Sequence, residues 1–468
     1  MFSRMSTQPT PDVTNTTGAP STGPARYAPG APSTGPARYA PGAPSTGPAR
    51  YAPGAPEYRR FFPQLEGMRA VAALGVLTTH VAFQTGVVRT PVIGPILGRL
   101  DLAVALFFAL SGFLLWRNWV AAAHRQARLP SVRRYLRHRV VRIWPAYVVV
   151  VVVVLTLLPE ARSADLTVWL ANLTLTQVFV PLSLTAGLTQ MWSLSVEVAF
   201  YLLLPIIGFV LMWLRGARVS ARVPTLLGLG VISFGWAWVA RALPLPAGTE
   251  PTNWVFGHLP WFVAGLVIAE VAGAADLGER STITRAIERI GARRWPMLAL
   301  FVVSYGLACT PIAGPTGLGV LAPWQFAVKM ALGALCAFAL LAPLVCEKPF
   351  GNSPRVRARF RFLTSPVMAA LGRWSYGIFI WHVAVLAVVF PLFGIVPFAG
   401  NTILVWCLTA VLSIGISAAS YAFVEEPARD WLRRRDRARR ARSRGNHRRT
   451  EDDIAEEISS DTATNAGN

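Results

Sequence analysis

The chain has 468 residues, of which 53% are hydrophobic, and a mean hydropathy of +0.44. Its formal net charge of +22 would suit a nucleic-acid partner, but nearly all Lys and Arg lie in short segments between apolar runs or in the two ends of the chain. Basic loops placed in this way face lipid headgroups and cytoplasm, so the pattern favours an integral membrane protein and argues against nucleic-acid binding.

Residues 1–60 are rich in Pro, Gly, Ala, Ser and Thr and contain three exact copies of the unit APSTGPARYAPG, at 19–30, 31–42 and 43–54. With almost no aliphatic side chains, this segment cannot bury enough surface to offset the entropy of ordering the chain. We therefore predict a disordered tail, and a plain linker is favoured over an adhesive tether. No apolar core follows its charges, so it does not resemble a secretory signal.

Apolar segments of about 17–25 residues, long enough to cross about 30 Å of hydrocarbon, recur through the rest of the chain. They cover approximately 67–88, 99–119, 144–158, 195–214, 224–243, 255–274, 297–313, 323–346, 367–390 and 401–424. A weaker stretch at 166–180 suits a half-helix outside the main bundle. The pattern predicts an all-α integral membrane domain over residues 61–428.

The placement of Arg sets the orientation of these segments. If the N-terminus is cytoplasmic, the inner loops and tail carry about thirty basic residues and the outer loops about four. An odd number of spans would break this bias, so we predict about ten transmembrane helices in the cell membrane, with both termini in the cytoplasm. Residues 429–468, Arg-rich and then acidic, are predicted to form a charged, disordered cytoplasmic tail.

Two ionisable residues share the first span, Arg69 and His80. Eleven residues at about 100° each bring them within about 20° of one face, with about 16 Å of rise between them. Ionisable groups in a span are costly unless they face a cavity or a partner, so both are functional candidates. The imidazole suits general-base catalysis or the carrying of an acyl group, and a His satisfied by a neighbouring carbonyl is the plain alternative.

Two carboxylates belong to the same outer half of the bilayer as His80. Asp101 opens the second span, and Glu197 lies at the outer end of the fourth. Either could orient His80 or balance its charge, and the sequence leaves open which one does so. Ser111 and Gly112 are expected to interrupt the second span and to admit close approach of another backbone.

The ninth span contributes a second intramembrane histidine, His382, with Ser375 and Tyr376 one to two turns before it. Lys329 in the eighth span is expected to be a lone cation whose amine extends to the outer surface. The four Cys residues lie in or beside apolar runs without zinc-like spacing, so no metal site is predicted.

On the cytoplasmic side, Arg139 and Arg142 are three residues apart just before the third span, on one face of a helix. The pair is well suited to clamp phosphate, since each guanidinium presents a fixed fork of donors to phosphate oxygens. A basic cluster that only sets the topology explains the same residues equally well.

The segment around Arg69 and His80, QLEGMRAVAALGVLTTHVAF, resembles the opening signature of the acyltransferase-3 family of membrane acyltransferases. WSLSVEVAFYLLLP is similar to that family's Trp-Ser-Leu-x-x-Glu motif, through Trp192, Ser193 and Glu197. Further resemblances, in the family's order, are DLAVALFFALSGFLL, the Arg-x-x-Arg pair of Arg139 and Arg142, SYGIFIWH and VEEPARDW. Together they span roughly 61–432, and the set is far more specific than any single motif.

The resemblance implies transfer of an acyl group, often acetyl, from cytoplasmic acyl-CoA to a hydroxyl of an extracytoplasmic glycan, lipid or natural product. Carried over by position, Arg139 and Arg142 would hold the phosphates of CoA, with Arg69 near the point where the pantetheine enters. His80 would be the central catalytic group, as base or acyl carrier, and Glu197 its acidic partner. The remaining candidates are Asp101 as a second catalytic carboxylate and, in supporting roles, Trp192, Ser193, Ser375, Tyr376 and His382.

Two features depart from the family pattern, the Pro-rich repeats and the short tail after the last span. Many relatives carry a fused extracytoplasmic esterase-like domain there. The standalone form expected here would need a separate envelope protein for a second transfer step, or would acylate its acceptor directly. In its Ala- and Arg-rich composition the chain is similar to actinobacterial relatives. Some of these acetylate trehalose lipids, so a trehalose lipid is one candidate acceptor.

The alternative function is a transporter or flippase of an envelope lipid or glycan, without covalent chemistry. Intramembrane charges and many spans fit that class as well. It predicts repeated halves with matching broken helices, and the sequence contains no such matching pair.

Overall fold

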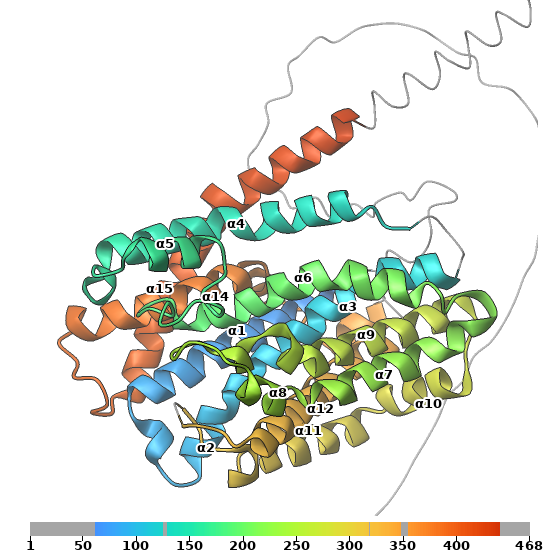
Figure 1. The fold of residues 1–468 in the computed structure, drawn as a ribbon, viewed down its shortest axis with the longest axis horizontal. Coiled ribbons are helices and arrows are strands. Elements are labelled where there is room, and N and C mark those ends of the chain that lie inside the picture. Colours follow the sequence, from blue (N-terminus) through green and yellow to red (C-terminus); the bar gives the residue numbers. More distant parts are fainter. Residues whose placement is uncertain (1–60, 125–128, 318, 348–353, 440–468) are drawn as a thin grey trace, which may run out of the picture. The chain divides into compact units, whose positions relative to one another are not determined.

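The computed structural model describes residues 61–124, 129–317, 319–347 and 354–439, and within these ranges it contains helices and no strand (Figure 1). The α-helices in the first half are α1 (Pro63–Gln84), α2 (Ile93–Gly98), α3 (Ala103–His124), α4 (Val132–Leu157), α5 (Leu166–Leu173), α6 (Trp192–Leu211), α7 (Arg222–Ser233) and α8 (Trp236–Ala242). Those in the second half are α9 (Val255–Leu277), α10 (Thr282–Gly291), α11 (Arg294–Ala308), α12 (Pro323–Cys346), α13 (Pro354–Arg359), α14 (Pro366–Leu392) and α15 (Thr402–Ser420). The predicted all-α class is confirmed.

Each expected apolar segment coincides with helical structure, and 224–243 divides into α7 and α8. Within the described ranges, 8 helical stretches are long and apolar enough to cross a membrane. Two of the expected segments fall outside this set of 8. They are α1, which carries Glu66 and Arg69, and α11, which has only 15 residues. The protein is therefore a multi-pass membrane protein, while the number of spans and the side of each terminus stay predictions.

Helix α9 lies at the centre of one group of helices, in contact with α3, α7 and α12. Its most apolar stretch is 89% buried, because apolar residues surround the helix on all sides. It crosses α3 closely: a Cβ added at Gly265 would lie 1.9 Å from the carbonyl oxygen of Ala109, and one at Gly112 would lie 2.5 Å from that of Phe262. The expected close approach at Gly112 is thus present, but α3 is continuous, so the expected interruption is wrong.

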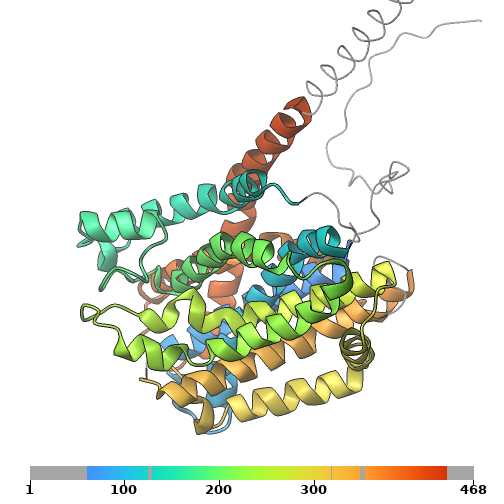
Figure 2. The same cartoon turned by 45° about the vertical axis from the view of Figure 1, so that its right-hand side comes forward.

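Helix α1 is packed between α3 and α14, and α14 in turn contacts α15 (Figures 1 and 2). A Cβ at Gly372 would lie 2.2 Å from the carbonyl oxygen of Glu66, so α1 and α14 also approach at backbone distance. This packing places Arg69 and His80 in the interior. Helix α4 is different, because its first fully buried side chain is Ile143, eleven residues after it begins.

The last helix extends beyond the predicted membrane domain. A π-helical turn (Tyr421–Glu425) follows α15, and helical structure continues to Arg439. Residues 429–439 are therefore helical, which corrects the expectation of disorder for that part of the tail. The rest of the tail and the repeats of residues 1–60 lie outside the described residues.

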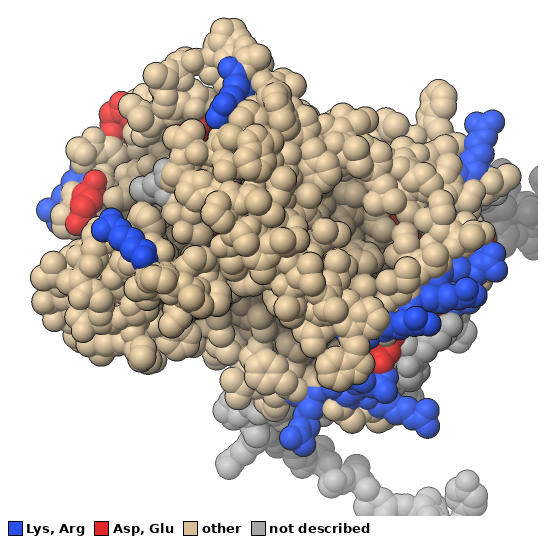
Figure 3. Space-filling view, turned by 90° about the horizontal axis from the view of Figure 1, so that it is seen from below, with Lys and Arg blue, Asp and Glu red and all other residues tan. Residues whose placement is uncertain are grey.

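One face of the molecule shows the charge pattern of a membrane protein. In Figure 3 the middle of the face carries almost no charged side chains, a basic group gathers at its right-hand end, and a few charges of both signs lie at its left-hand end. An uncharged belt beside a basic edge is the pattern expected of spans that end at a cytoplasmic surface.

Candidate active site

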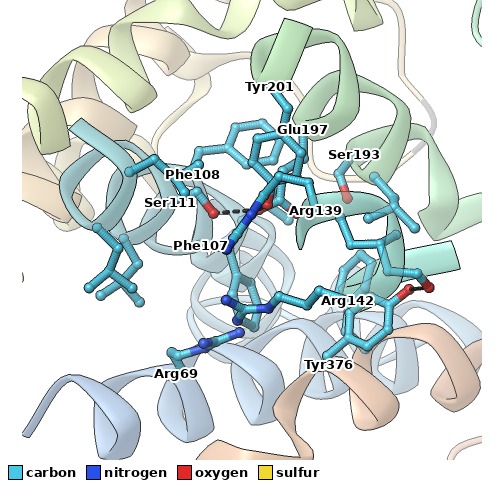
Figure 4. A pocket seen from close by; sticks show the side chains of 17 residues that line it. Arg69, Phe107, Phe108, Ser111, Arg139, Arg142, Ser193, Glu197, Tyr201 and Tyr376 are labelled. Atoms are coloured by element: carbon cyan, nitrogen blue, oxygen red, sulfur yellow. Dashed lines mark hydrogen bonds between the residues drawn. The ribbon is translucent and has the colours of Figure 1, made fainter. Parts of the chain in front are cut away.

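A cavity of about 720 Å³, including the part open to solvent, lies between α1, α3, α4, α6 and α14 (Figure 4). We call it the arginine cavity. Its polar lining consists of Arg69, Ser111, Arg139, Arg142, Ser193, Glu197, Tyr201 and Tyr376, and its apolar lining includes Val104, Phe107, Phe108, Leu110, Leu114, Leu115, Ile143, Leu194 and Phe379.

Three guanidinium groups line the cavity. Arg69 comes from α1, and Arg139 and Arg142 come from α4; Figure 4 shows their side chains directed toward the same space. Arg142 acts electrostatically on both of the others, so the like charges are close. In the described part of the chain none of the three forms a salt bridge, and Arg139 Nε is buried without a hydrogen-bond partner. Glu66 and Glu197 act on Arg69, and Glu425 acts on Arg69 and Arg142, by charge through space only. Clustered guanidinium groups without a direct ion pair are suited to bind an anionic ligand.

Glu197 is the carboxylate of the arginine cavity. It accepts hydrogen bonds from the Ser111 hydroxyl of α3 and, at 2.6 Å, from the Tyr201 hydroxyl one turn further along α6. The guanidinium of Arg139 lies over the Tyr201 ring, 5.8 Å from its centroid. Glu197 therefore links α3 to α6 on two sides of the cavity. Tyr201, which donates to Glu197, also contacts the guanidinium of Arg139.

Other predicted residues have structural partners near the cavity. Tyr376 lines it and donates a hydrogen bond of 2.7 Å to the Ile143 carbonyl, which ties α14 to α4. Ser193 donates to the carbonyl of Gln190 in its own turn. Ser375 donates to the carbonyl of Gly372 in its own helix and is fully buried. The Trp192 ring lies outside the cavity lining, with its centroid 5.1 Å from that of His258.

His80 and His382 lie next to each other, with ring centroids 5.1 Å apart, and neither belongs to the lining of the arginine cavity. His382 is fully buried, and its Nδ1 is 2.7 Å from the carbonyl oxygen of Phe379. Because a carbonyl only accepts, Nδ1 carries a proton, and Nε2 is left without a hydrogen-bond partner within the described residues. The spacing rule placed Arg69 and His80 on one face, and the structure puts them at different levels of the bundle.

Neither candidate carboxylate contacts His80 among the residues that the structure describes. Asp101 Oδ2 instead lies 2.6 Å from Lys329 Nζ and 4.0 Å from Arg99 Nη1, although its charge acts on His80 through space. The interpretation of Lys329 as a lone cation is therefore wrong. Glu197 is a member of the arginine cavity, so the sequence rule that grouped it with His80 by depth did not predict its contacts.

A buried ionic network was missed by sequence reasoning. Glu270 of α9 accepts from the guanidinium of Arg222 at 2.8 Å and from Trp116 Nε1 at 2.7 Å, and His124 Nε2 lies 3.8 Å away. Arg222 and Glu270 are buried, and no described group of three or more His, Cys, Asp or Glu could hold a metal ion. A Glu within a long apolar run was the available signal. The network joins α3, α7 and α9 away from the cavity.

A second missed carboxylate is Glu425, in the π-helical turn. It is 1% exposed, its Oε2 lies 3.2 Å from Arg429, and its charge acts on Arg142 and Arg69. π-Helical turns are frequent at functional sites, which agrees with its position beside the cavity. The motif VEEPARDW contained this residue without indicating its neighbours.

The C-terminal helical segment, residues 426–439, contacts the exposed start of α4. Asp436 forms ion pairs with Arg137, with Arg134 at 3.6 Å and with His138 at 2.9 Å. These positions directly precede Arg139. Asp436 therefore ties the C-terminal helical segment to the part of α4 that directly precedes the cavity arginines.

Comparison with known proteins gives a consistent result. A family model described as an acyltransferase domain matches residues 62–422. The peptidoglycan O-acetyltransferase OatA of Listeria monocytogenes is 25% identical over 398 residues, which cover 79% of this chain and 56% of that protein. The acyltransferase MdmB of Streptomyces mycarofaciens is 28% identical over 357 residues, 69% of this chain and 79% of that protein.

The O-acetyltransferase OatA of Staphylococcus aureus is 21% identical over 393 residues, 79% of this chain and 57% of that protein. The chain thus spans little more than half the length of the two O-acetyltransferases. No solved structure matches it.

Proposed function

Because the chain belongs to the acyltransferase-3 family, and is therefore an acyltransferase, we propose that it moves an acyl group from cytoplasmic acyl-CoA to an extracytoplasmic hydroxyl. The acyl group proposed is acetyl, after the O-acetyltransferases among its relatives. The acceptor proposed is a hydroxyl of an envelope glycan or glycolipid, with a trehalose lipid as one candidate. The reaction takes place in the cell membrane, among membrane lipids.

One observation carries the choice of donor: three guanidinium groups line one cavity without a salt bridge in the described chain. Acyl-CoA carries a pyrophosphate, whose oxygens match the donor forks of Arg. In this proposal Arg139 and Arg142 bind the phosphates, and Arg69, on α1, lies near the point where the pantetheine enters. The bound phosphates would form the direct ion pairs that the three guanidinium groups do not form with described carboxylates.

His80 is the proposed catalytic group, as a general base or as an acyl carrier. As a base, it takes the proton of the acceptor hydroxyl while the oxygen attacks the thioester carbonyl; the C–S bond breaks, the ester C–O bond forms, and CoA leaves as the thiol with that proton. As a carrier, its nitrogen attacks the thioester carbonyl, the C–S bond breaks, and CoA leaves as the thiol with the imidazole proton. The acceptor oxygen then attacks the acyl carbon, the C–N bond breaks, and the hydroxyl proton returns to the imidazole. His382 is proposed to hold the ring of His80 by packing against it.

The two carboxylates have different proposed roles. Glu197 supports the donor site by fixing Ser111 and Tyr201, rather than pairing with His80. Asp101 acts on His80 by charge through space, and Lys329 and Arg99 fix its position.

The proposal is tested by incubating membrane vesicles that contain the protein with acetyl-CoA labelled in the acetyl group. The expected result is a lipid or glycan that gains one labelled acetyl group for each free CoA released, and its mass identifies the acceptor. Vesicles without the protein are the control. A transporter would move unmodified acceptor, so transport without labelled product would refute the proposal in favour of that alternative.

Asp436→Asn is expected to raise the KM for acyl-CoA about fivefold, corresponding to about 1 kcal/mol, with little change in kcat. The reason is that Arg139 and Arg142 lose the restraint on their helix, while the reacting groups are untouched. Initial rates over a range of acetyl-CoA concentrations measure this split. Asp430→Asn is the matched control, because Asp430 pairs only with Arg433 in its own helix among the described residues. Equal KM values for the two variants would contradict the restraint.

A further inference from the structure

Two aromatic rings line the arginine cavity, and one of them lies next to the histidine pair. Phe107 of α3 and Phe379 of α14 both line the cavity, and their ring centroids are 5.8 Å apart at an interplanar angle of 68°. On its other side, Phe379 lies 6.0 Å from the ring of His382, which lies 5.1 Å from that of His80. We call the two phenylalanines the Phe107–Phe379 wall.

The wall is about one helical turn thick. Along α14, Tyr376 lines the cavity, Phe379 follows three residues later, and His382 three residues after that. Each step is about 4.5 Å along the helix axis, and residues three apart lie on one face. Tyr376, Phe379 and His382 therefore follow one another along α14 from the cavity toward His80, and the Phe379 ring is next to both the cavity and the His382 ring.

We infer that the Phe107–Phe379 wall selects the acyl group, because it closes the end of the arginine cavity that faces His80. This inference rests on the proposed function. With the phosphates of the donor at the arginines, the thioester end points away from them and meets the two rings. A short acyl group fits against the rings and reaches His80 by a rotation of the Phe379 side chain, whereas a longer chain collides with them.

Phe379 is the specificity-determining member of the pair. Its ring contacts both Phe107 and His382, and it is 7% exposed, so its size sets the space between the cavity and His80. The bonds that change are those of the proposed reaction: the thioester C–S bond breaks and the acyl carbon bonds to the acceptor oxygen. Phe379 takes no part in proton or electron transfer.

The test compares acetyl-CoA and butyryl-CoA as donors for the wild type and for Phe379→Ala. Each methylene in an apolar pocket changes discrimination by about tenfold or more, so the ratio of kcat/KM for butyryl to acetyl is expected to rise at least about tenfold in the variant. Phe379→Leu is expected to give a smaller rise in the same direction. A ratio does not depend on how much protein folds, so partial misfolding does not obscure the result.

Phe390→Ala is the matched control, since Phe390 is a buried phenylalanine of the same helix and lies outside the cavity lining. Its donor ratio is expected to equal that of the wild type. If the wild type transfers acetyl and Phe379→Ala keeps the wild-type ratio, the wall does not select the acyl group. If the wild type transfers from neither acyl-CoA, the proposed function itself fails, which is a distinct outcome.

Discussion

Replacing His80 by Ala is expected to lower acyl transfer by at least about a hundredfold, the usual contribution of a positioned general base. His80 lies beside His382 and outside the arginine cavity, so donor binding should remain. The measurements are labelled acyl transfer in vesicles and, separately, equilibrium binding of CoA to the purified protein. Loss of transfer with unchanged CoA binding is the expected pattern.

His258→Phe is the control for this variant. His258 is a buried histidine enclosed by Phe108, Trp192 and Trp261, and its Nδ1 lies 3.4 Å from the carbonyl oxygen of Trp254. Transfer by this variant should be near that of the wild type. Normal transfer by a correctly inserted His80→Ala protein would remove His80 from the mechanism.

A mass measurement on the same two proteins, the wild type and His80→Ala, distinguishes the two roles of His80. If it carries the acyl group, wild-type protein given donor without acceptor gains the mass of one acyl group, and the His80→Ala protein does not. If it acts as a base, neither protein gains mass.

The second large effect is expected from Arg139→Ala combined with Arg142→Ala, which should raise the KM for acyl-CoA by about a hundredfold. Each charge-assisted hydrogen bond contributes about 1.5–3 kcal/mol, and about 1.4 kcal/mol corresponds to tenfold in affinity. Replacing both by Lys should give an intermediate loss, because Lys keeps the charge but loses the two-pronged geometry. Titration of acetyl-CoA in the transfer assay, and direct CoA binding, measure the effect.

Arg133→Ala is the matched control for the arginine pair. Arg133 has the same charge and belongs to the same helix, but it is exposed and does not line the cavity. Its removal should change the KM for acyl-CoA by less than about twofold, since an exposed charge contributes little. If the Ala and Lys variants of Arg139 and Arg142 have the same KM for acyl-CoA as the wild type, the cavity does not bind CoA.

Sequence reasoning predicted the class of the protein and the positions of its helices. Transmembrane segments are recognisable because each must be apolar over its own length, whatever its neighbours are. The ionisable residues within these segments, such as Arg69 and His80, were identifiable for the same reason. Arg139 and Arg142 were predicted as a pair because three residues along a helix is a local spacing, and the structure places both in one cavity with Arg69.

The contacts between helices were predicted less well. Depth along a span grouped Glu197 and Asp101 with His80, but Glu197 accepts hydrogen bonds from Ser111 and Tyr201, and Asp101 pairs with Lys329. Depth is one coordinate only. Which side chains meet also depends on how each helix is rotated about its axis and which helix lies beside it.

The sequence by itself thus determined that the protein is a helical membrane protein with cationic and imidazole groups buried in its spans, because those properties follow from local composition and spacing. Only the tertiary structure decided that three arginines share one cavity, that Asp436 pairs with the start of their helix, and that Phe107 and Phe379 line the cavity with Phe379 beside His382. The physical reason is that these contacts join residues far apart in the chain, and close packing at Gly112, Gly265 and Gly372 sets which helix faces meet.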